Sequence, residues 1–162
     1  MSRSIALAWL AAGVMLFGGC GRHDGGELRG KPVRPDNKLK VKAELLSVDP
    51  TTLSRSSGGR VVIRILLTNL EDKAKQIEFE TSKVYSLYAW DEAGHKFELG
   101  KPGDPVATTV ELEPGGTKIF EYPWDGHVRA DGDVIYLSPG RYELEARVKG
   151  ALSNTEFVWI NE

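Results

Sequence analysis

A two-residue alternation of apolar and polar side chains runs through most of the chain after residue 38. In LKVKAELLSV (39–48), every second residue from Leu39 to Leu45 is apolar, and charged residues stand between them. RYELEARVKG (141–150) repeats this spacing. Because successive side chains of a strand point to opposite faces of a sheet, the spacing predicts strands that bury one face. No segment after residue 20 has a credible helical period.

Turn signals separate these short segments. EPGG (113–116) combines a proline that presets φ with glycines that reach the left-handed region, and SPG (138–140) does the same before residue 141. VVIRILLTNL (61–70) is almost continuously apolar, which predicts a central strand covered on both faces. We therefore expect strands at 39–48, 61–70, 75–80, 84–90, 96–99, 108–112, 117–124, 141–150 and 155–160.

Together these segments predict an all-β fold, an antiparallel β-sandwich of about eight or nine short strands. The chain has one cysteine, so no disulfide can join the two sheets. An apolar fraction of 41% is sufficient for a core that side-chain packing alone holds together. The candidate large core residues are Tyr88, Trp90, Phe120 and Trp124. We assign residues 39–162 to this one domain.

The lone cysteine, Cys20, follows a short apolar segment at the start of the chain. One positive charge precedes the apolar run 5–17, which has the length of a signal-peptide hydrophobic region and is too short to span a bilayer. LFGGC (16–20) resembles the lipobox of bacterial lipoproteins, whose cysteine becomes the new N-terminus and carries a diacylglyceryl group. The resemblance predicts a signal peptide at 1–19 and lipid attachment at Cys20.

Three other fates of Cys20 stay open. It can be a buried structural cysteine or a catalytic nucleophile, and the signal can be cleaved without lipidation. Against the first two, residues 21–38 are rich in Gly, Pro, Arg and Lys with little to bury, and the three histidines stand in no recognisable catalytic constellation. We expect 20–38 to be a lipidated N-terminus and a flexible tether.

Lipidation would anchor the protein to the lipid bilayer of a bacterial cell envelope, facing the periplasm or the exterior. Removal of residues 1–19 would leave 20 basic and 23 acidic side chains. This slightly acidic balance argues against a nucleic-acid partner.

Three longer segments combine aromatic strands with glycine turns in a definite order. They are VYSLYAWDEAGHKFEL (84–99), VELEPGGTKIFEYPWDG (110–126) and LSPGRYELEARV (137–148). Their order and spacing resemble the BsuPI-type intracellular proteinase inhibitor family over most of residues 40–150. The matching positions are Tyr85, Trp90, Asp91, Gly94, Leu112, Pro114, Gly115, Tyr122, Trp124, Asp125, Gly126, Pro139, Gly140 and Tyr142. The resemblance implies an immunoglobulin-like sandwich that contacts a protease, and it carries over no reactive-site residue.

Candidate binding loops are 49–59, 100–107 and 125–137. The first contains Leu53 and Arg55, which the pockets of chymotrypsin-like and trypsin-like proteases accept. Its serines and glycines make it flexible, so an ordinary connecting loop is the alternative that we favour.

The third loop also contains three carboxylates, Asp125, Asp131 and Asp133. Oxygen ligands in a glycine-containing loop can collect calcium, but the spacing differs from an EF-hand loop and Asp-Gly pairs are common hairpin-turn residues. We predict no metal site and no cofactor.

No motif of an enzyme occurs in the sequence, whether a nucleophile elbow, a phosphate-binding glycine loop or a zinc-ligand pair. We therefore predict a lipid-anchored envelope binding module, similar to a proteinase inhibitor, that acts by protein contact with a protease or another envelope protein. The alternative is a structural or assembly lipoprotein that pairs a strand edge with a neighbour and inhibits nothing.

Overall fold

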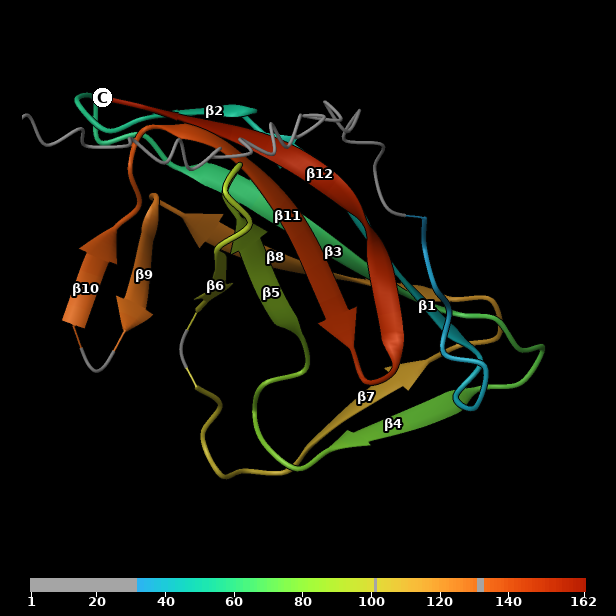
Figure 1. Cartoon of the computed structure of the whole chain (residues 1–162). Helices are drawn as coiled ribbons and strands as arrows, with labels where there is room; N and C mark the ends of the chain where they lie inside the picture. The colour runs from blue at the N-terminus through green and yellow to red at the C-terminus, as the bar shows by residue number, and fades with distance from the viewer. Residues whose placement is uncertain (1–31, 101, 131–132) are drawn as a thin grey trace, which may run out of the picture.

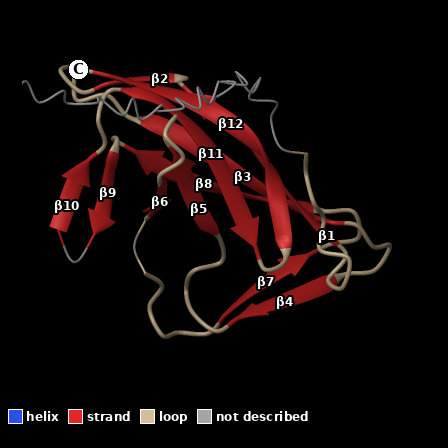
Figure 2. Cartoon of the chain, in the orientation of Figure 1, coloured by secondary structure: helices blue, strands red, loops and turns tan. Residues whose placement is uncertain are grey.

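The computed structural model describes residues 32–100, 102–130 and 133–162, and these ranges form twelve strands and no helix (Figures 1 and 2). The strands are β1 (Val41–Asp49), β2 (Thr52–Ser54), β3 (Val61–Asn69), β4 (Lys75–Phe79), β5 (Ser86–Trp90), β6 (Lys96–Leu99), β7 (Thr108–Leu112), β8 (Thr117–Trp124), β9 (His127–Ala130), β10 (Asp133–Tyr136), β11 (Gly140–Val148) and β12 (Ala151–Asn161). The predicted all-β fold is confirmed.

Two larger sheets form the body of the domain. One has the strand order β2-β12-β11-β5-β6 and the other the order β1-β3-β8, while β4–β7 and β9–β10 form separate two-stranded ribbons (Figure 1). Neighbouring strands are antiparallel except β2, which runs parallel to β12 with Thr52 opposite Trp159. Strand β1 also contacts β11 and β12, so the two larger sheets share one core.

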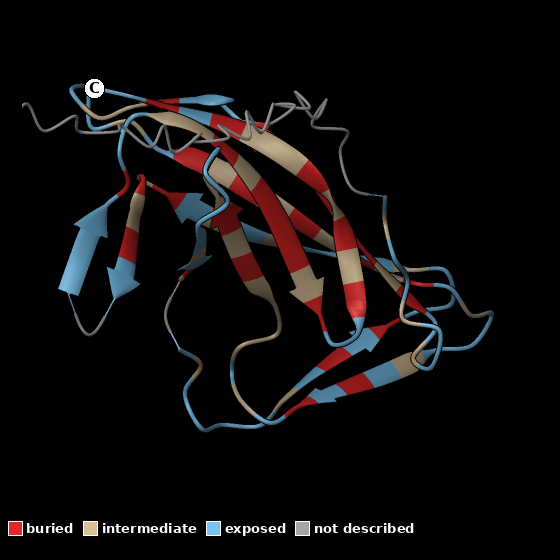
Figure 3. Ribbon diagram, viewed as in Figure 1, coloured by how far each residue is buried: buried red, intermediate tan, exposed pale blue. Residues whose placement is uncertain are grey.

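The core is built from the inward-facing residues of strands in which buried and more exposed residues alternate. Ile63, Ile65 and Leu67 on β3 are 0% exposed, as are Leu144 and Val148 on β11. Figure 3 shows the resulting alternation of buried and more exposed residues along β3 and β12. Burying each such side chain contributes about 1.5–3 kcal/mol, which makes this alternation the main cause of the fold.

Strand β3 is central in its sheet, between β1 and β8, but the prediction that both of its faces are covered is wrong. Its burial alternates strictly, and Val62, Arg64 and Leu66 on the outer face are half-buried. The sequence is almost continuously apolar here because Val62 and Leu66 on the outer face are also apolar, although no second layer covers them in the described structure.

Of the four expected aromatic core residues, Trp124 alone is buried, with 1% exposure. Phe120 is partly buried against the core, and Tyr88 and Trp90 are half-buried. The last two alternate along β5 with the buried Leu87 and Ala89, so they belong to the outer face of the five-stranded sheet. Aliphatic side chains fill most of the core instead.

The described strands outnumber the expected eight or nine because three of them lie in segments that we interpreted as loops. Strand β2 lies in the predicted loop 49–59, and β9 and β10 lie in the predicted loop 125–137. With three or four residues each, these strands are too short to show a period. They are strands because of their pairing: β2 pairs with β12, and β9 pairs with β10.

The folded part of the chain begins before residue 39. Arg34 and Leu152 exchange two backbone hydrogen bonds of 2.9 and 2.8 Å, and the carboxylate of Asp36 accepts from the amides of Lys38, Leu39 and Gly150. The end of the predicted tether 20–38 is therefore packed on the domain. The predicted signal peptide and Cys20 lie outside the described residues. In the described ranges no helix has the length and apolar character needed to cross a membrane.

Candidate binding site

The three candidate loops, which are remote in sequence, meet at one end of the sandwich. The guanidinium carbon of Arg55 lies 5.8 Å from the centroid of the Tyr136 ring, which joins the first loop to the third. Gly100 lines a hollow together with His127 and Arg129, which joins the second loop to the third. We call this region, defined by β9, β10 and residues 55 and 100, the hairpin end.

Ribbon β9–β10 projects from the sandwich at the hairpin end (Figure 1). All four residues of β10 are exposed, and Val134, Ile135 and Tyr136 have exposed fractions of 49%, 47% and 57%. One edge of β10 pairs with β9, and no other described strand pairs with its second edge. An apolar strand with an unpaired edge is a template for pairing with another chain.

The base of this hairpin is fixed by buried groups. The indole Nε1 of Trp124 donates a 2.7 Å hydrogen bond to the carbonyl of His127, and the amide of Leu137 donates to the carbonyl of Gly126. Gly126 has φ of +85°, and a Cβ there would lie 3.4 Å from Leu53 Cδ2. This turn therefore requires glycine, and it holds the exposed strand in a defined direction.

His127 links the turn to the exposed strand. Its Nδ1 contacts Oδ1 of Asp125, and its ring packs edge-on against Tyr136 with 6.0 Å between centroids. Asp125 therefore orients a histidine within the hairpin. Asp133 is exposed at the start of β10, and Asp131 lies outside the described residues. Among the described residues no group of three or more His, Cys, Asp or Glu could hold a metal ion.

Leu53 and Arg55 differ in their availability to a partner. Leu53 is 1% exposed on β2 and packs in the core, so its side chain is not accessible to a partner in this structure. Arg55 is half-buried, and its Nε and Nη2 atoms are buried without a hydrogen-bond partner in the described part of the chain. Such donors are uncommon in folded proteins and are a reason to look for a function at Arg55.

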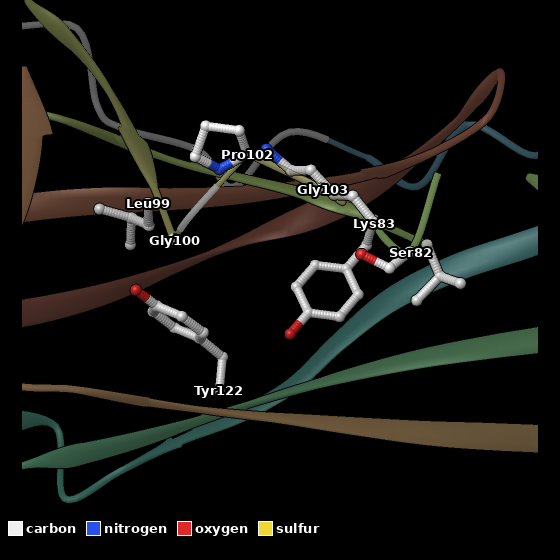
Figure 4. Close-up of a pocket in the computed structure, with 9 residues that line it drawn as sticks. Ser82, Lys83, Leu99, Gly100, Pro102, Gly103 and Tyr122 are labelled. Atoms are coloured by element: carbon white, nitrogen blue, oxygen red, sulfur yellow. The ribbon is translucent and has the colours of Figure 1, made fainter. Parts of the chain in front are cut away.

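A hollow of about 190 Å³ lies beside the hairpin end, between the end of β6 and Tyr122 on β8 (Figure 4). Its lining residues are Ser82, Lys83, Val84, Tyr85, Leu99, Gly100, Pro102, Gly103 and Tyr122. Burial raises the pKa of both tyrosine hydroxyls, and for Tyr122 the nearby Tyr85 and Asp125 add to the shift. The tyrosines therefore stay neutral and present aromatic rings with hydroxyl groups.

A second hollow of about 210 Å³ is lined by Gly100, Tyr122, His127, Val128 and Arg129. The two hollows share Tyr122 and Gly100, so a surface depression continues from the sandwich edge to β9. Sequence reasoning used Tyr85 and Tyr122 only as family positions. It missed Val134–Tyr136, although the β-prone triplet Val-Ile-Tyr after the sequence Asp-Gly-Asp was the available signal.

The fold and this surface define a β-sandwich that carries an exposed strand on a fixed base and two small hollows beside it. The sequence matches the model of the family BsuPI, intracellular proteinase inhibitor, over residues 48–152. The chain belongs to this family. No curated protein matches the sequence.

The solved structures that resemble this chain have low sequence identity to it. The alkylpurine DNA glycosylase AlkC of Pseudomonas fluorescens, bound to DNA with an abasic site analogue, has a TM-score of 0.50 and 17% identity, with 76% of this chain and 31% of that chain covered. β-Glucosidases from Listeria innocua and Kluyveromyces marxianus have TM-scores of 0.45 and 0.47, with 13% and 14% identity. The alignment with the Listeria innocua enzyme covers 75% of this chain and 16% of that chain. The alignment with the Kluyveromyces marxianus enzyme covers 77% of this chain and 14% of that chain.

Proposed function

We propose that this protein binds a proteinase through the hairpin end and inhibits it. The observation that carries the proposal is the exposure of β10. Its residues Val134, Ile135 and Tyr136 are exposed to solvent, and one edge of the strand is unpaired in the described structure. Membership of the BsuPI family supports a proteinase as the partner.

A rigid hairpin suits this role for an energetic reason. A flexible loop must lose conformational freedom when it binds, at a cost of about 0.5–1.5 kcal/mol for each immobilised side chain. Strand β10 is already extended by its pairing with β9, in which Val134 faces Arg129 and Ile135 faces Val128. Its side chains alternate in direction, so neighbouring residues can enter different pockets of an enzyme.

The test is a titration of trypsin-like, chymotrypsin-like and subtilisin-like proteases with the full chain. We expect saturable loss of activity of one class near one-to-one stoichiometry, with the inhibitor intact on a gel. Ile135→Asp should weaken inhibition about ten-fold or more, because it places a charge in an apolar contact. The matched control is Ile119→Asp on β8, where the isoleucine is exposed to a similar extent, 53% against 47%.

We also propose that the protein is a lipoprotein of the cell envelope, held to the bilayer by acylated Cys20. The support is the LFGGC motif after a short apolar run. Two or three acyl chains anchor a protein firmly, whereas one does so marginally. We expect Cys20→Ala to move the protein from the membrane fraction to the soluble fraction after cell breakage. Membrane association that persists in this variant would refute lipid anchoring at Cys20.

The exposed edge also favours a second function, that of an assembly module which adds a strand of another envelope protein to β10. The titration distinguishes the two. An assembly module leaves all three protease classes active at large excess, and a photocrosslinker at position 136 should then capture one envelope protein, but not in the Ile135→Asp variant.

A further inference from the structure

The hollow between Tyr85 and Tyr122 has preformed walls. The backbone amide of Ser82 donates to the carbonyl of Asp104 (3.0 Å), and the amide of Asp104 donates to the hydroxyl of Ser82 (2.8 Å). This pair of hydrogen bonds fixes the 102–104 segment against residues 82–83, which precede β5. A Cβ on Gly103 would lie 2.7 Å from Lys83 Cβ, so the close approach of the two segments depends on glycine.

Size and lining indicate what the hollow can hold. A dry apolar cavity of about 150 Å³ in another protein accommodates benzene, and this hollow of about 190 Å³ has room for one six-membered ring. Ligand sites for whole small molecules are larger, about 300–1,000 Å³. Tyr85 and Tyr122 offer ring edges and faces, the geometry in which aromatic pairs gain contact energy. The fit is therefore to one aromatic side chain.

Charge distinguishes the two ends of the depression. Lys83 Nζ at the first hollow is paired with Glu98, so its charge is neutralised. Arg129 lines the second hollow, is exposed, and forms no ion pair with any residue that the structure describes. An occupant that crosses Tyr122 from the first hollow to the second therefore meets one available cation, which favours a carboxylate there.

We propose that the Tyr85–Tyr122 hollow is a socket for one aromatic side chain of the partner protein, and that Arg129 binds a carboxylate close to that side chain. That the occupant belongs to a protein rests on the proposed function, since the socket adjoins the exposed hairpin that we assign to protein contact. Aromatic anchors that enter preformed pockets dominate the energetics of many protein interfaces. The socket then gives the hairpin end its specificity.

The socket can be tested without the partner. The probes are N-acetyl-4-fluorophenylalanine, which carries a carboxylate, and its neutral N-methylamide, each titrated into the full chain in detergent and followed by fluorine NMR. A micelle-only sample corrects for partitioning. We expect line broadening that saturates for both probes, tighter binding of the carboxylate probe, and intermolecular NOEs from the probe to the ring protons of Tyr85 and Tyr122.

Two matched pairs of variants locate the contacts. Pro102→Trp at the rim should weaken both probes about ten-fold by occluding the ring, while Pro105→Trp in the same loop but outside the lining should leave them unchanged. Arg129→Gln should weaken the carboxylate probe about five-fold and spare the amide, while Lys118→Gln should affect neither. Circular dichroism checks that each variant is folded.

Absence of saturable binding to the unmodified chain overturns the socket, as does equal binding to Pro102→Trp and Pro105→Trp. The protease titration separates this failure from failure of the proposed function. If the chain inhibits a protease and Pro102→Trp inhibits it equally well, the socket is wrong and the inhibitory function stands. If no protease is inhibited but the ring probe binds between the tyrosines, the inhibitory function is wrong and the socket stands.

Discussion

The surroundings of Arg55 do not stabilise the folded chain, because they leave buried donor atoms without hydrogen bonds. Two of its guanidinium nitrogens are buried without a hydrogen-bond partner in the described structure, and its charge lies over the exposed Tyr136 ring. Leaving a buried donor unsatisfied costs about 1–3 kcal/mol. Functional surfaces often retain side chains that are unfavourable in the free protein.

Replacing Arg55 with methionine separates these two roles. Arg55→Met keeps a long side chain and removes the buried donors, so we expect the free energy of unfolding to rise by about 1 kcal/mol. Inhibition of the partner protease should fall at the same time. Urea denaturation and the protease titration measure the two effects, with the exposed Arg60→Met as control. A less stable Arg55→Met protein would show that the guanidinium stabilises the fold.

Side-chain pattern predicted individual residues well where a strand was long enough. Tyr142, Leu144, Ala146 and Val148 were expected on one face and all four are buried. The burial of Leu53 could not be predicted, because one leucine between serines and threonines carries no period and its place in the core depends on the parallel pairing of β2 with β12. The contact between Arg55 and Tyr136 joins positions about eighty residues apart, which a single sequence cannot reveal.

At the scale of elements, turns were predicted more reliably than ribbons. The EPGG and SPG turns lie where the sequence placed them, before β8 and β11, and Gly115 takes the expected left-handed φ of +62°. The β9–β10 hairpin was missed because its strands are short and their exposed residues bury no face. The alternation of apolar and polar residues reveals buried faces, so an exposed strand escapes it.

The N-terminal segment is an element whose attachment depends on a carboxylate. Hydrogen bonds from the backbone amide of Leu39, and also from those of Lys38 and Gly150, hold the pKa of Asp36 below its usual value. A carboxylate with a lower pKa in the folded chain stabilises the fold above its unfolded pKa of about 3.9. This stabilisation is lost as pH falls through the folded value.

We therefore expect Asp36→Asn to be less stable than the original chain at neutral pH, with a difference that shrinks as the pH falls below about 4. Urea denaturation at a series of pH values measures this difference. Asp72→Asn, in the exposed turn between β3 and β4, is the control that removes one carboxylate elsewhere on the surface. A difference between Asp36→Asn and the original chain that is constant with pH would exclude the role of the Asp36 charge.

At the scale of the whole molecule, the sequence predicted the class of fold and the single core but not how the layers cover one another. Alternation along β1, β3 and β11 specifies which face of each strand is buried. It does not specify which strands share a sheet, because that depends on pairings such as β3 with β8 and β11 with β5. The hairpin end follows from this arrangement, since it brings residues of the 49–59, 100–107 and 125–137 segments together.

Two substitutions in adjacent residues test this architecture. Ile65 is 0% exposed between the sheets, whereas Leu66 is half-buried on the outer face of the same strand. We expect Ile65→Ala to lower the free energy of unfolding by about 2–5 kcal/mol, because it removes packed atoms and leaves a cavity. Leu66→Ala should cost about 1 kcal/mol or less, because neighbouring side chains and water can fill the space it leaves. Urea denaturation with an unchanged m-value measures both, and equal losses would mean that a further layer covers the outer face of β3.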